Sequence, residues 1–330
     1  MVVTVRVNSL KPLTWTPFLS SLNSFNWPCS FISIPRKYSK STPLFSQMAT
    51  SEAEPQIMTK VIDSHLHVWA SPQEAAEKYP YFPGQEPSLP GHVDYLLECM
   101  EEAGVDGALI VQPINHKFDH SYVTSALKKY PSKFVGCCLA NPAEDGSGIK
   151  QLEDLVLEMT NEIGKALFSK AGELGVPVGF MCMKGLLLHL QEIEELCTEI
   201  PSTVVLLDHV AFCKPPKNDE ERQGFLELLK LSRFPQVYVK FSALFRVSRN
   251  PYPYEDLSQV LAQLVSSYGA PRIMWGSDFP FIVAECGYRE AREAVSYLAV
   301  QGHLPSSATE WIMGKTVMQL FDGKWSSVVN

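Results

Sequence analysis

The chain has 330 residues, of which 45% are hydrophobic and 19% are charged, and its formal net charge at pH 7 is −8. A chain of this length can bury a large core, and its negative charge disfavours nucleic acid and anionic membrane as partners. The eight cysteines include no Cys-x-x-C pair. They therefore predict reduced thiols in the core rather than a disulfide framework or a thiolate metal site.

Residues 1–50 have the composition of an organelle leader. Nine of them are Ser, five are Lys or Arg, and none is Asp or Glu. Transit peptides have this composition, and no apolar run in the segment reaches the roughly 20 residues of a membrane span. We therefore expect a disordered transit peptide for the chloroplast. Import into mitochondria, or a cytoplasmic product that starts at Met48, are the alternatives. Loss of the segment would change the net charge from −8 to −13.

From Val61 onward, short apolar runs alternate with helical patterns, and this alternation predicts a parallel sheet covered by helices. The predicted strands are Val61–Val68, Asp106–Val111, Phe134–Leu139, Val176–Met181, Thr203–Asp208, Val237–Phe241 and Arg272–Trp275. The predicted helices are Val93–Ala103, Ser121–Lys129, Ile149–Met159, Thr160–Leu174, Leu187–Glu199, Glu220–Leu231, Tyr254–Tyr268, Tyr288–Val300 and Ser307–Phe321.

Seven strands are one fewer than a closed (β/α)8 barrel needs. The irregularity lies between Asn141 and Val176, where two helical patterns meet at Met159 and Thr160 with no strand between them. Parallel strands must alternate with their crossover helices, so a strand and its loop, roughly 15 to 25 residues, are missing. We expect an α/β fold over residues 57–322, a (β/α)8 TIM barrel missing or distorted at its fourth strand, with a tail at 323–330. The alternative is an open seven-stranded sheet.

The first predicted strand, within Val61–Trp69, carries two histidines near its end, His65 and His67. Residues i and i+2 of a strand point to the same face, so the two imidazoles are expected to project together. Such a pair at the mouth of a barrel makes a metal site or an electrophilic pocket. The alternative is that both are core histidines without a catalytic role.

Two later strands also end in polar residues, with Asp208 and His209 after one and Asp278 after the other. Imidazoles and a carboxylate can hold a divalent cation with an open position, and the cation lowers the pKa of bound water toward 7. Without metal, the imidazoles can polarise a carbonyl while Asp278 takes a proton from water. Asp278 is the base in both versions. Alone, it would be more typical of a turn or a helix cap.

Four motifs in this order resemble the amidohydrolase-related family, the branch of the amidohydrolase superfamily that holds lactonases and metal-dependent decarboxylases. The resemblance covers about residues 57–322 and rests on Asp63–Trp69, Leu207–His209, Val239–Ser242 and Trp275–Pro280. It implies a (β/α)8 barrel whose metal ligands are His65, His67, His209 and Asp278, with His209 and Asp278 catalytic. The implied cofactor is one divalent ion, zinc first, with metal-free catalysis as the alternative.

The chain also departs from that family. The segment that matches strand five, Val178–Met183, has no His, and the bridging Lys or Glu of strand four would fall in the missing run, so only a mononuclear or metal-free site is expected. The same run in similar proteins carries Arg residues for a substrate carboxylate. We expect Lys240 and Arg246 to take over substrate binding, with Trp69 walling the site, although each is also typical of surface or core.

We therefore expect a plastid hydrolase that opens a small lactone, or a similar cyclic ester or amide, that is anionic or polyhydroxylated. A metal-dependent decarboxylase on the same scaffold is the alternative, and a catalytically impaired shortened isoform is another. Neither nucleic acid nor membrane is an expected partner. The sequence allows a homodimer, and no residue pattern identifies the substrate.

Overall fold

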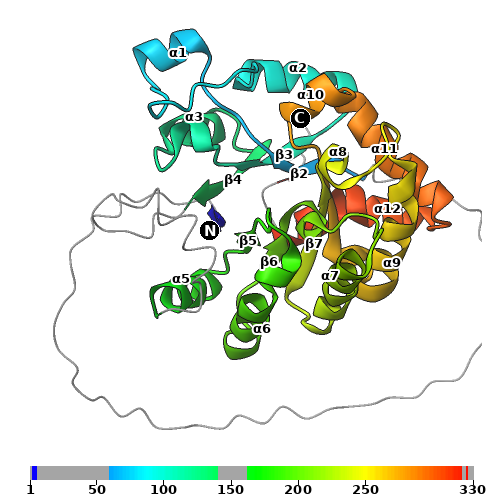
Figure 1. Cartoon of the computed structure of the whole chain (residues 1–330). Helices are drawn as coiled ribbons and strands as arrows, with labels where there is room; N and C mark the ends of the chain where they lie inside the picture. Colours follow the sequence, from blue (N-terminus) through cyan, green and yellow to red (C-terminus); the bar gives the residue numbers. More distant parts are fainter. Residues whose placement is uncertain (1, 6–58, 140–161, 322–324, 326–330) are drawn as a thin grey trace, which may run out of the picture. The chain divides into compact units, whose positions relative to one another are not determined.

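The computed structural model describes residues 2–5, 59–139, 162–321 and 325. Residues 1–7 and 59–330 form one compact unit, and residues 8–58 form a second unit that lies outside the described residues. The first unit contains every strand and helix described below (Figure 1).

The described strands form one eight-stranded sheet in the order β2-β3-β4-β1-β5-β6-β7-β8. The strands are β1 Val2–Val5, β2 Ile62–Leu66, β3 Gly107–Val111, β4 Phe134–Leu139, β5 Val178–Phe180, β6 Val205–Leu207, β7 Val237–Ser242 and β8 Ile273–Gly276. The seven strands from β2 to β8 lie at the predicted places, within two residues at their ends. Buried apolar runs such as β3 are typical of parallel strands that are covered on both faces.

Helices follow the strands of the described chain. They are α1 Pro72–Glu77, α2 Val93–Ala103, α3 Ser121–Lys129, α5 Glu162–Glu173, α6 Leu190–Glu199, α7 Asp219–Lys230, α8 Leu244–Val247, α9 Ser258–Tyr268, α10 Phe281–Glu285, α11 Tyr288–Gln301, α12 Ser306–Glu310 and α13 Thr316–Leu320. The predicted helix Ile149–Met159 lies outside the described residues. None of the helices described is both long and apolar enough to cross a bilayer.

Local sequence explains the ends of helix α2. The ring of His92 accepts a hydrogen bond from the backbone N–H of Tyr95 at its start, and Gly104 ends the helix at φ 64°. Glycine adopts this left-handed conformation without a Cβ penalty, which is why it commonly ends helices. Between the ends, the buried residues recur at helical spacing, as a helix on a barrel surface requires.

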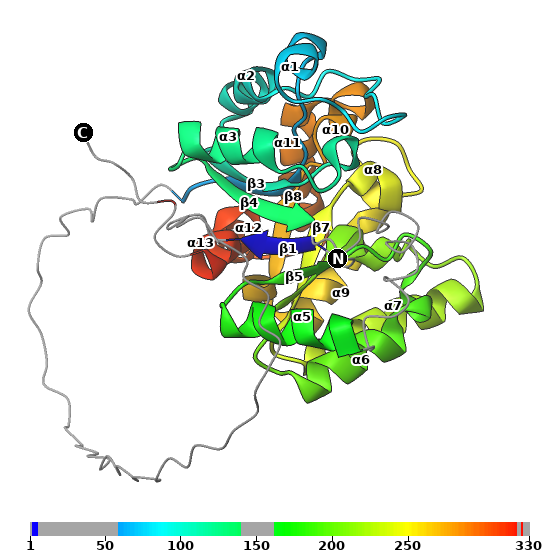
Figure 2. The ribbon, with the colours of Figure 1, turned by 90° about the vertical axis from the view of Figure 1, so that its left-hand side faces the viewer.

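The position between β4 and β5 is filled by the N-terminal strand β1. Figure 2 shows β1, in dark blue, lying between these two strands. β1 runs antiparallel to both, and Val3 pairs with Cys138 of β4 and with Val178 of β5. Two strands with a gap between them leave backbone N–H and C=O groups unpaired, and a β-branched Val-Val-Thr-Val run can satisfy them.

This placement corrects two expectations. Residues 2–5 form a strand, so the expectation of disorder does not hold for them. Residues 6–58 lie outside the described residues, and the leader role of residues 1–50 stays a prediction. The fourth position of the sheet is occupied, so the open seven-stranded alternative is wrong. The junction of Met159 and Thr160 is not described, and the missing strand also stays a prediction.

The two outer strands of the sheet, β2 and β8, approach each other without forming a ladder. The backbone N–H of Asp278 donates to the carbonyl of His65 at 2.8 Å. The carboxylate of Asp63 bridges the same junction, because it accepts from the N–H of Ser277 at 3.0 Å and from the hydroxyl of Tyr288 at 2.9 Å. The fold is therefore an α/β barrel of the (β/α)8 type that is not closed by strand pairing.

The core has two parts. The larger one lies between the strands and the helices, and the smaller one includes Ile62, Val111 and Met274 together with Phe321 and Trp325. Trp325 lies in the predicted C-terminal tail, and its side chain is buried in this smaller core. The histidines and the aspartate that the sequence singled out lie at the carboxyl ends of β2, β6 and β8.

Candidate active site

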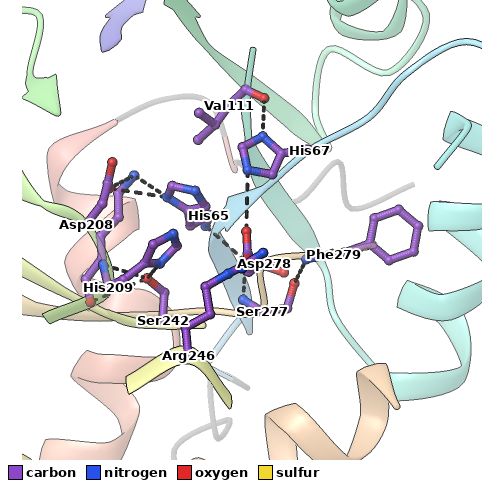
Figure 3. Close-up of polar contacts among 12 residues, drawn as sticks. His65, His67, Val111, Asp208, His209, Ser242, Arg246, Ser277, Asp278 and Phe279 are labelled. Carbon is purple, nitrogen blue, oxygen red and sulfur yellow. Dashed lines mark hydrogen bonds and ion pairs between the residues drawn. The ribbon is translucent and has the colours of Figure 1, made fainter. Parts of the chain in front are cut away.

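The four side chains that the sequence singled out converge at the carboxyl ends of the strands (Figure 3). His65 lies in β2 and His67 directly after it, while His209 follows β6 and Asp278 follows β8. The ring centroid of His65 is 5.2 Å from that of His67 and 4.4 Å from that of His209. Nε2 of His67 is 3.4 Å from Oδ1 of Asp278. The predicted convergence is therefore present.

Three of these residues fit a metal ion. His65, His67 and Asp278 each offer one ligand atom, and these atoms all lie within 4.8 Å of one another. Nε2 of His65 is buried and has no hydrogen-bond partner. Nδ1 of His67 is bound to the carbonyl of Val111 at 3.0 Å, which leaves Nε2 for the cluster. Two imidazole nitrogens and one carboxylate oxygen are a common ligand set for catalytic zinc.

His209 was expected as a further ligand, but it lies outside this group of three. Its ring Nδ1 is 2.8 Å from Oγ of Ser242, and its backbone N–H donates to the same oxygen at 3.2 Å. Burial, together with the neighbouring His65, lowers the pKa of His209 to about 3. Burial also lowers the pKa of His65. Both rings are therefore neutral at pH 7, the form that binds metals and donates to or accepts from a substrate.

The turn that carries His209 is strained. His209, Val210, Ala211 and Phe212 all have φ between 50° and 56°, and Asp278 has φ 66°. This left-handed conformation costs roughly 1–2 kcal/mol for each residue that is not glycine. Complete burial of Val210 and Ala211 holds the turn in place. Such strain is concentrated at functional sites, where packing enforces it.

The carboxylate of Asp278 is held from two sides. Oδ1 faces His67, and Oδ2 accepts a hydrogen bond from Nε of Arg246 at 2.7 Å. Burial alone would raise the pKa of Asp278, but the hydrogen bond to His67 and the nearby His209 outweigh it and keep the pKa well below its usual range. Asp278 is therefore ionised at neutral pH, as a ligand or a base must be.

Arg246 lies at the edge of this arrangement. Its side chain is 37% exposed, and its guanidinium carbon lies 4.7 Å from the ring centroid of Phe245 and 4.9 Å from that of Phe281. Stacking on aromatic rings holds the planar guanidinium in a fixed orientation. Arg246 is thus both in contact with Asp278 and partly accessible, as the prediction of a substrate-binding role requires.

Lys240 lies elsewhere than expected. It is 1% exposed, and its Nζ is 2.9 Å from Oδ1 of Asp208 and 3.2 Å from Nδ1 of His65. The predicted substrate contact is therefore wrong, because the side chain from β7 ends behind His65 and its charge is balanced by a buried carboxylate. The sequence placed Asp208 at the end of a strand beside His209 but predicted no role for it.

Trp69 is also less accessible than a substrate contact requires. It is 3% exposed, and its Nε1 donates to the carbonyl of Leu89 at 2.9 Å. Its ring centroid is 5.8 Å from that of Phe281. Trp69 thus supports Phe281 from behind, which corrects the expectation that it contacts substrate directly.

β5 contributes no described ligand, as its sequence predicts. Cys182 follows the strand and is 1% exposed. Burial raises the pKa of its thiol far above the usual value. Among the described residues, the group that could hold a metal ion consists of His65, His67 and Asp278 and does not include Cys182. The described site therefore has the ligands for one metal ion.

Sequence comparisons agree with this arrangement. Residues 62–322 match the amidohydrolase family. Over 233 residues, the chain is 25% identical to a 4-sulfomuconolactone hydrolase of Hydrogenophaga intermedia, a match that covers 66% of this chain and 74% of that protein.

Solved structures have the same fold. A protein of Pseudomonas putida assigned as 2-pyrone-4,6-dicarboxylic acid hydrolase has a TM-score of 0.63 and 24% sequence identity, over 82% of this chain and 99% of that one. An amidohydrolase of Burkholderia multivorans with bound zinc has a TM-score of 0.59 and 18% identity, over 79% and 99% of the two chains. At these identities the likeness shows the barrel fold alone.

Proposed function

Because the chain belongs to the amidohydrolase family, we propose that it is a hydrolase that opens a small anionic lactone by attack of water at the site of His65, His67 and Asp278. The observation that carries the proposal is the convergence of two imidazoles and one ionised carboxylate at the carboxyl ends of the barrel strands. This end of a (β/α)8 barrel holds the active site in characterised enzymes of the fold. Two relatives named as 4-sulfomuconolactone hydrolases support the choice of substrate class.

The residues of the chain account for the steps of this reaction. Nε2 of His65 and Nε2 of His67, with a carboxylate oxygen of Asp278, would hold one divalent cation, which supplies Lewis-acid polarisation and a lower pKa for water. Asp278 takes a proton from the attacking water while the water oxygen bonds to the carbonyl carbon of the lactone. The ring C–O bond then breaks, and the proton passes to the departing alkoxide oxygen. His209, neutral and beside His65, orients the carbonyl.

The ion that we propose is zinc, since two imidazoles and a carboxylate suit it. Exchange of His67 for Asn is expected to lower the affinity for zinc by about tenfold or more, because one of three ligands is lost. Titration calorimetry of the metal-stripped protein measures the affinity, and assays with and without a chelator measure the dependence of turnover on metal.

His303 provides the control for this variant. It is exposed and has φ 56°, a conformation that Asn tolerates, so exchange of His303 for Asn should leave zinc binding unchanged. Equal affinity in the wild type and the His67→Asn variant would remove the cation site from the proposal. Full turnover in chelator would favour the version in which imidazoles alone polarise the carbonyl.

Arg246 is proposed to bind the anionic group of the substrate. Exchange of Arg246 for Lys should raise KM for an anionic lactone by about 10- to 100-fold, because a planar, bidentate donor is replaced by a point charge. The same variant should change KM for a neutral lactone of equal ring size much less. A change that acts through the contact with Asp278 would affect both lactones, so the comparison separates it from anion binding. Equal changes for both lactones would contradict the assignment.

The decarboxylase alternative has less support, because β5 contributes no described ligand and that chemistry depends on a tightly bound metal. A third alternative, an impaired shortened form, would be rejected by purified protein that stays soluble and hydrolyses a lactone. We further propose that the acidic body binds neither nucleic acid nor anionic membrane, and that it acts as a monomer or homodimer.

We also propose that residues 1–50 direct import into the chloroplast, on the basis of their composition. Cleavage after this segment would remove β1 from between β4 and β5. The mass of the protein recovered from isolated chloroplasts tests the proposal, since an unprocessed or excluded chain would contradict it.

A further inference from the structure

Nδ1 of His65 has two buried neighbours of opposite chemical character. Oδ1 of Asp208, which can only accept a hydrogen bond when ionised, is 3.2 Å away. Nζ of Lys240, which can only donate when charged, is also 3.2 Å away. All three side chains are at most 1% exposed, so water does not compete for these contacts.

The choice between these neighbours decides what the other ring nitrogen can do. A neutral imidazole carries one proton, on either Nδ1 or Nε2. If Nδ1–H donates to Asp208, Nε2 presents a lone pair and can bind a cation. If Nδ1 accepts from Lys240, Nε2 carries the proton and can only donate, for example to a carbonyl oxygen. One ring thus supports either of two chemistries.

The geometry favours Asp208 as the partner. The ammonium of Lys240 makes its shorter contact with Oδ1 of Asp208, at 2.9 Å, whereas a carboxylate oxygen can accept from both Lys240 and His65 at once. The two opposite charges also balance each other, which reduces the cost of burying them. Nε2 of His65 is buried without a hydrogen-bond partner and belongs to the cluster with His67 and Asp278.

We propose that Asp208 is a positioning residue that selects the tautomer of His65, with Lys240 as its supporting partner. Asp208 accepts the Nδ1 proton and so directs the Nε2 lone pair toward the cation, while Lys240 holds the Asp208 carboxylate in place. This inference rests on the proposed cation site. It also gives Lys240 a role consistent with its burial, in place of a substrate contact.

The tautomer can be read directly in the metal-stripped, full-length protein. Long-range proton–nitrogen correlation spectra of 15N-histidine-labelled protein distinguish a protonated from an unprotonated Nε2, and comparison with a His65→Asn variant assigns the signals. We expect Nε2 of His65 to be unprotonated in the wild type. A protonated Nε2 would overturn the proposal.

Two variants test which neighbour is responsible. In Asp208→Leu, Lys240 is the remaining neighbour of Nδ1, so the proton should move to Nε2 and the Kd for zinc should rise by about tenfold or more. In the double variant Asp208→Leu, Lys240→Met, the competing donor is also gone, and zinc affinity should recover in part. A folded Asp208→Leu variant with an unchanged tautomer and zinc affinity would overturn the proposal.

Asp63 offers a matched control. It is a buried carboxylate that binds the backbone N–H of His65 and the hydroxyl of Tyr288, not the imidazole ring. Asp63→Asn should therefore lower the melting temperature without moving the His65 proton. If Asp208→Leu does not fold, Lys240→Met serves instead, since its His65 should keep the wild-type tautomer, and a change would overturn the proposal.

The same measurements separate this inference from the proposed function. An unprotonated Nε2 in a wild-type protein that binds no zinc and ignores chelator would leave the tautomer assignment intact and remove the cation. If the protein binds zinc although Nε2 of His65 is protonated before metal is added, the cation site remains and the tautomer assignment is removed.

Discussion

Exchange of Asp278 for Asn is expected to lower kcat for lactone hydrolysis by about 100- to 10,000-fold, the usual contribution of a general base. An amide cannot take the proton from water, and it removes the anionic oxygen that faces Nε2 of His67 at 3.4 Å. The shape of the side chain is unchanged, so the fold should persist. Steady-state kinetics measure the loss, and circular dichroism and calorimetry measure the fold.

Asp219 provides the control for this variant. It is fully exposed in the first turn of α7, where its carboxylate faces Arg222, so Asp219→Asn should leave kcat unchanged. A wild-type rate in folded Asp278→Asn protein would contradict the role of Asp278 as base. A loss that appears in zinc affinity but not in the rate at saturating zinc would make it a ligand only.

Exchange of Val3 for Pro is expected to lower the free energy of unfolding by about 2–3 kcal/mol. Val3 pairs with β4 on one side and β5 on the other, and proline removes an N–H from an interior strand and leaves a carbonyl partner unsatisfied. Urea denaturation measures the free energy. Hydrogen exchange should accelerate at the amides of Phe134–Leu139 and Val178–Phe180.

Val3→Ile is the matched control, because it keeps a β-branched side chain and the backbone N–H. Unchanged stability and exchange in Val3→Pro would show that β1 does not belong to the sheet in solution.

The hypothesis of a shortened barrel is tested by comparing this chain with one in which a parallel fourth strand is restored. The restored chain should be more stable and more active. Equal melting temperature and activity would remove that hypothesis.

The sequence by itself determined the strands and the composition of the site. β2 to β8 were predictable because each is a short apolar run between turn signals, a property of neighbouring residues. His65 and His67 were predictable as a pair because side chains alternate along a strand, and His209 and Asp278 because each lies two residues after the end of a strand. The sequence also shows that the end of β5 lacks a histidine ligand, since Val178–Met183 contains Cys182 but no His.

The tertiary structure decided which side chains these residues meet. Lys240 and His65 are 175 positions apart, and His65 and Asp208 are 143 apart, so neither contact follows from local pattern. Burial of Lys240, the contact between Arg246 and Asp278, and the insertion of β1 beside β4 all depend on how distant segments pack. Local periodicity determines which face a side chain occupies, whereas its partners and its exposure are set only when the sheet curves and brings those faces together.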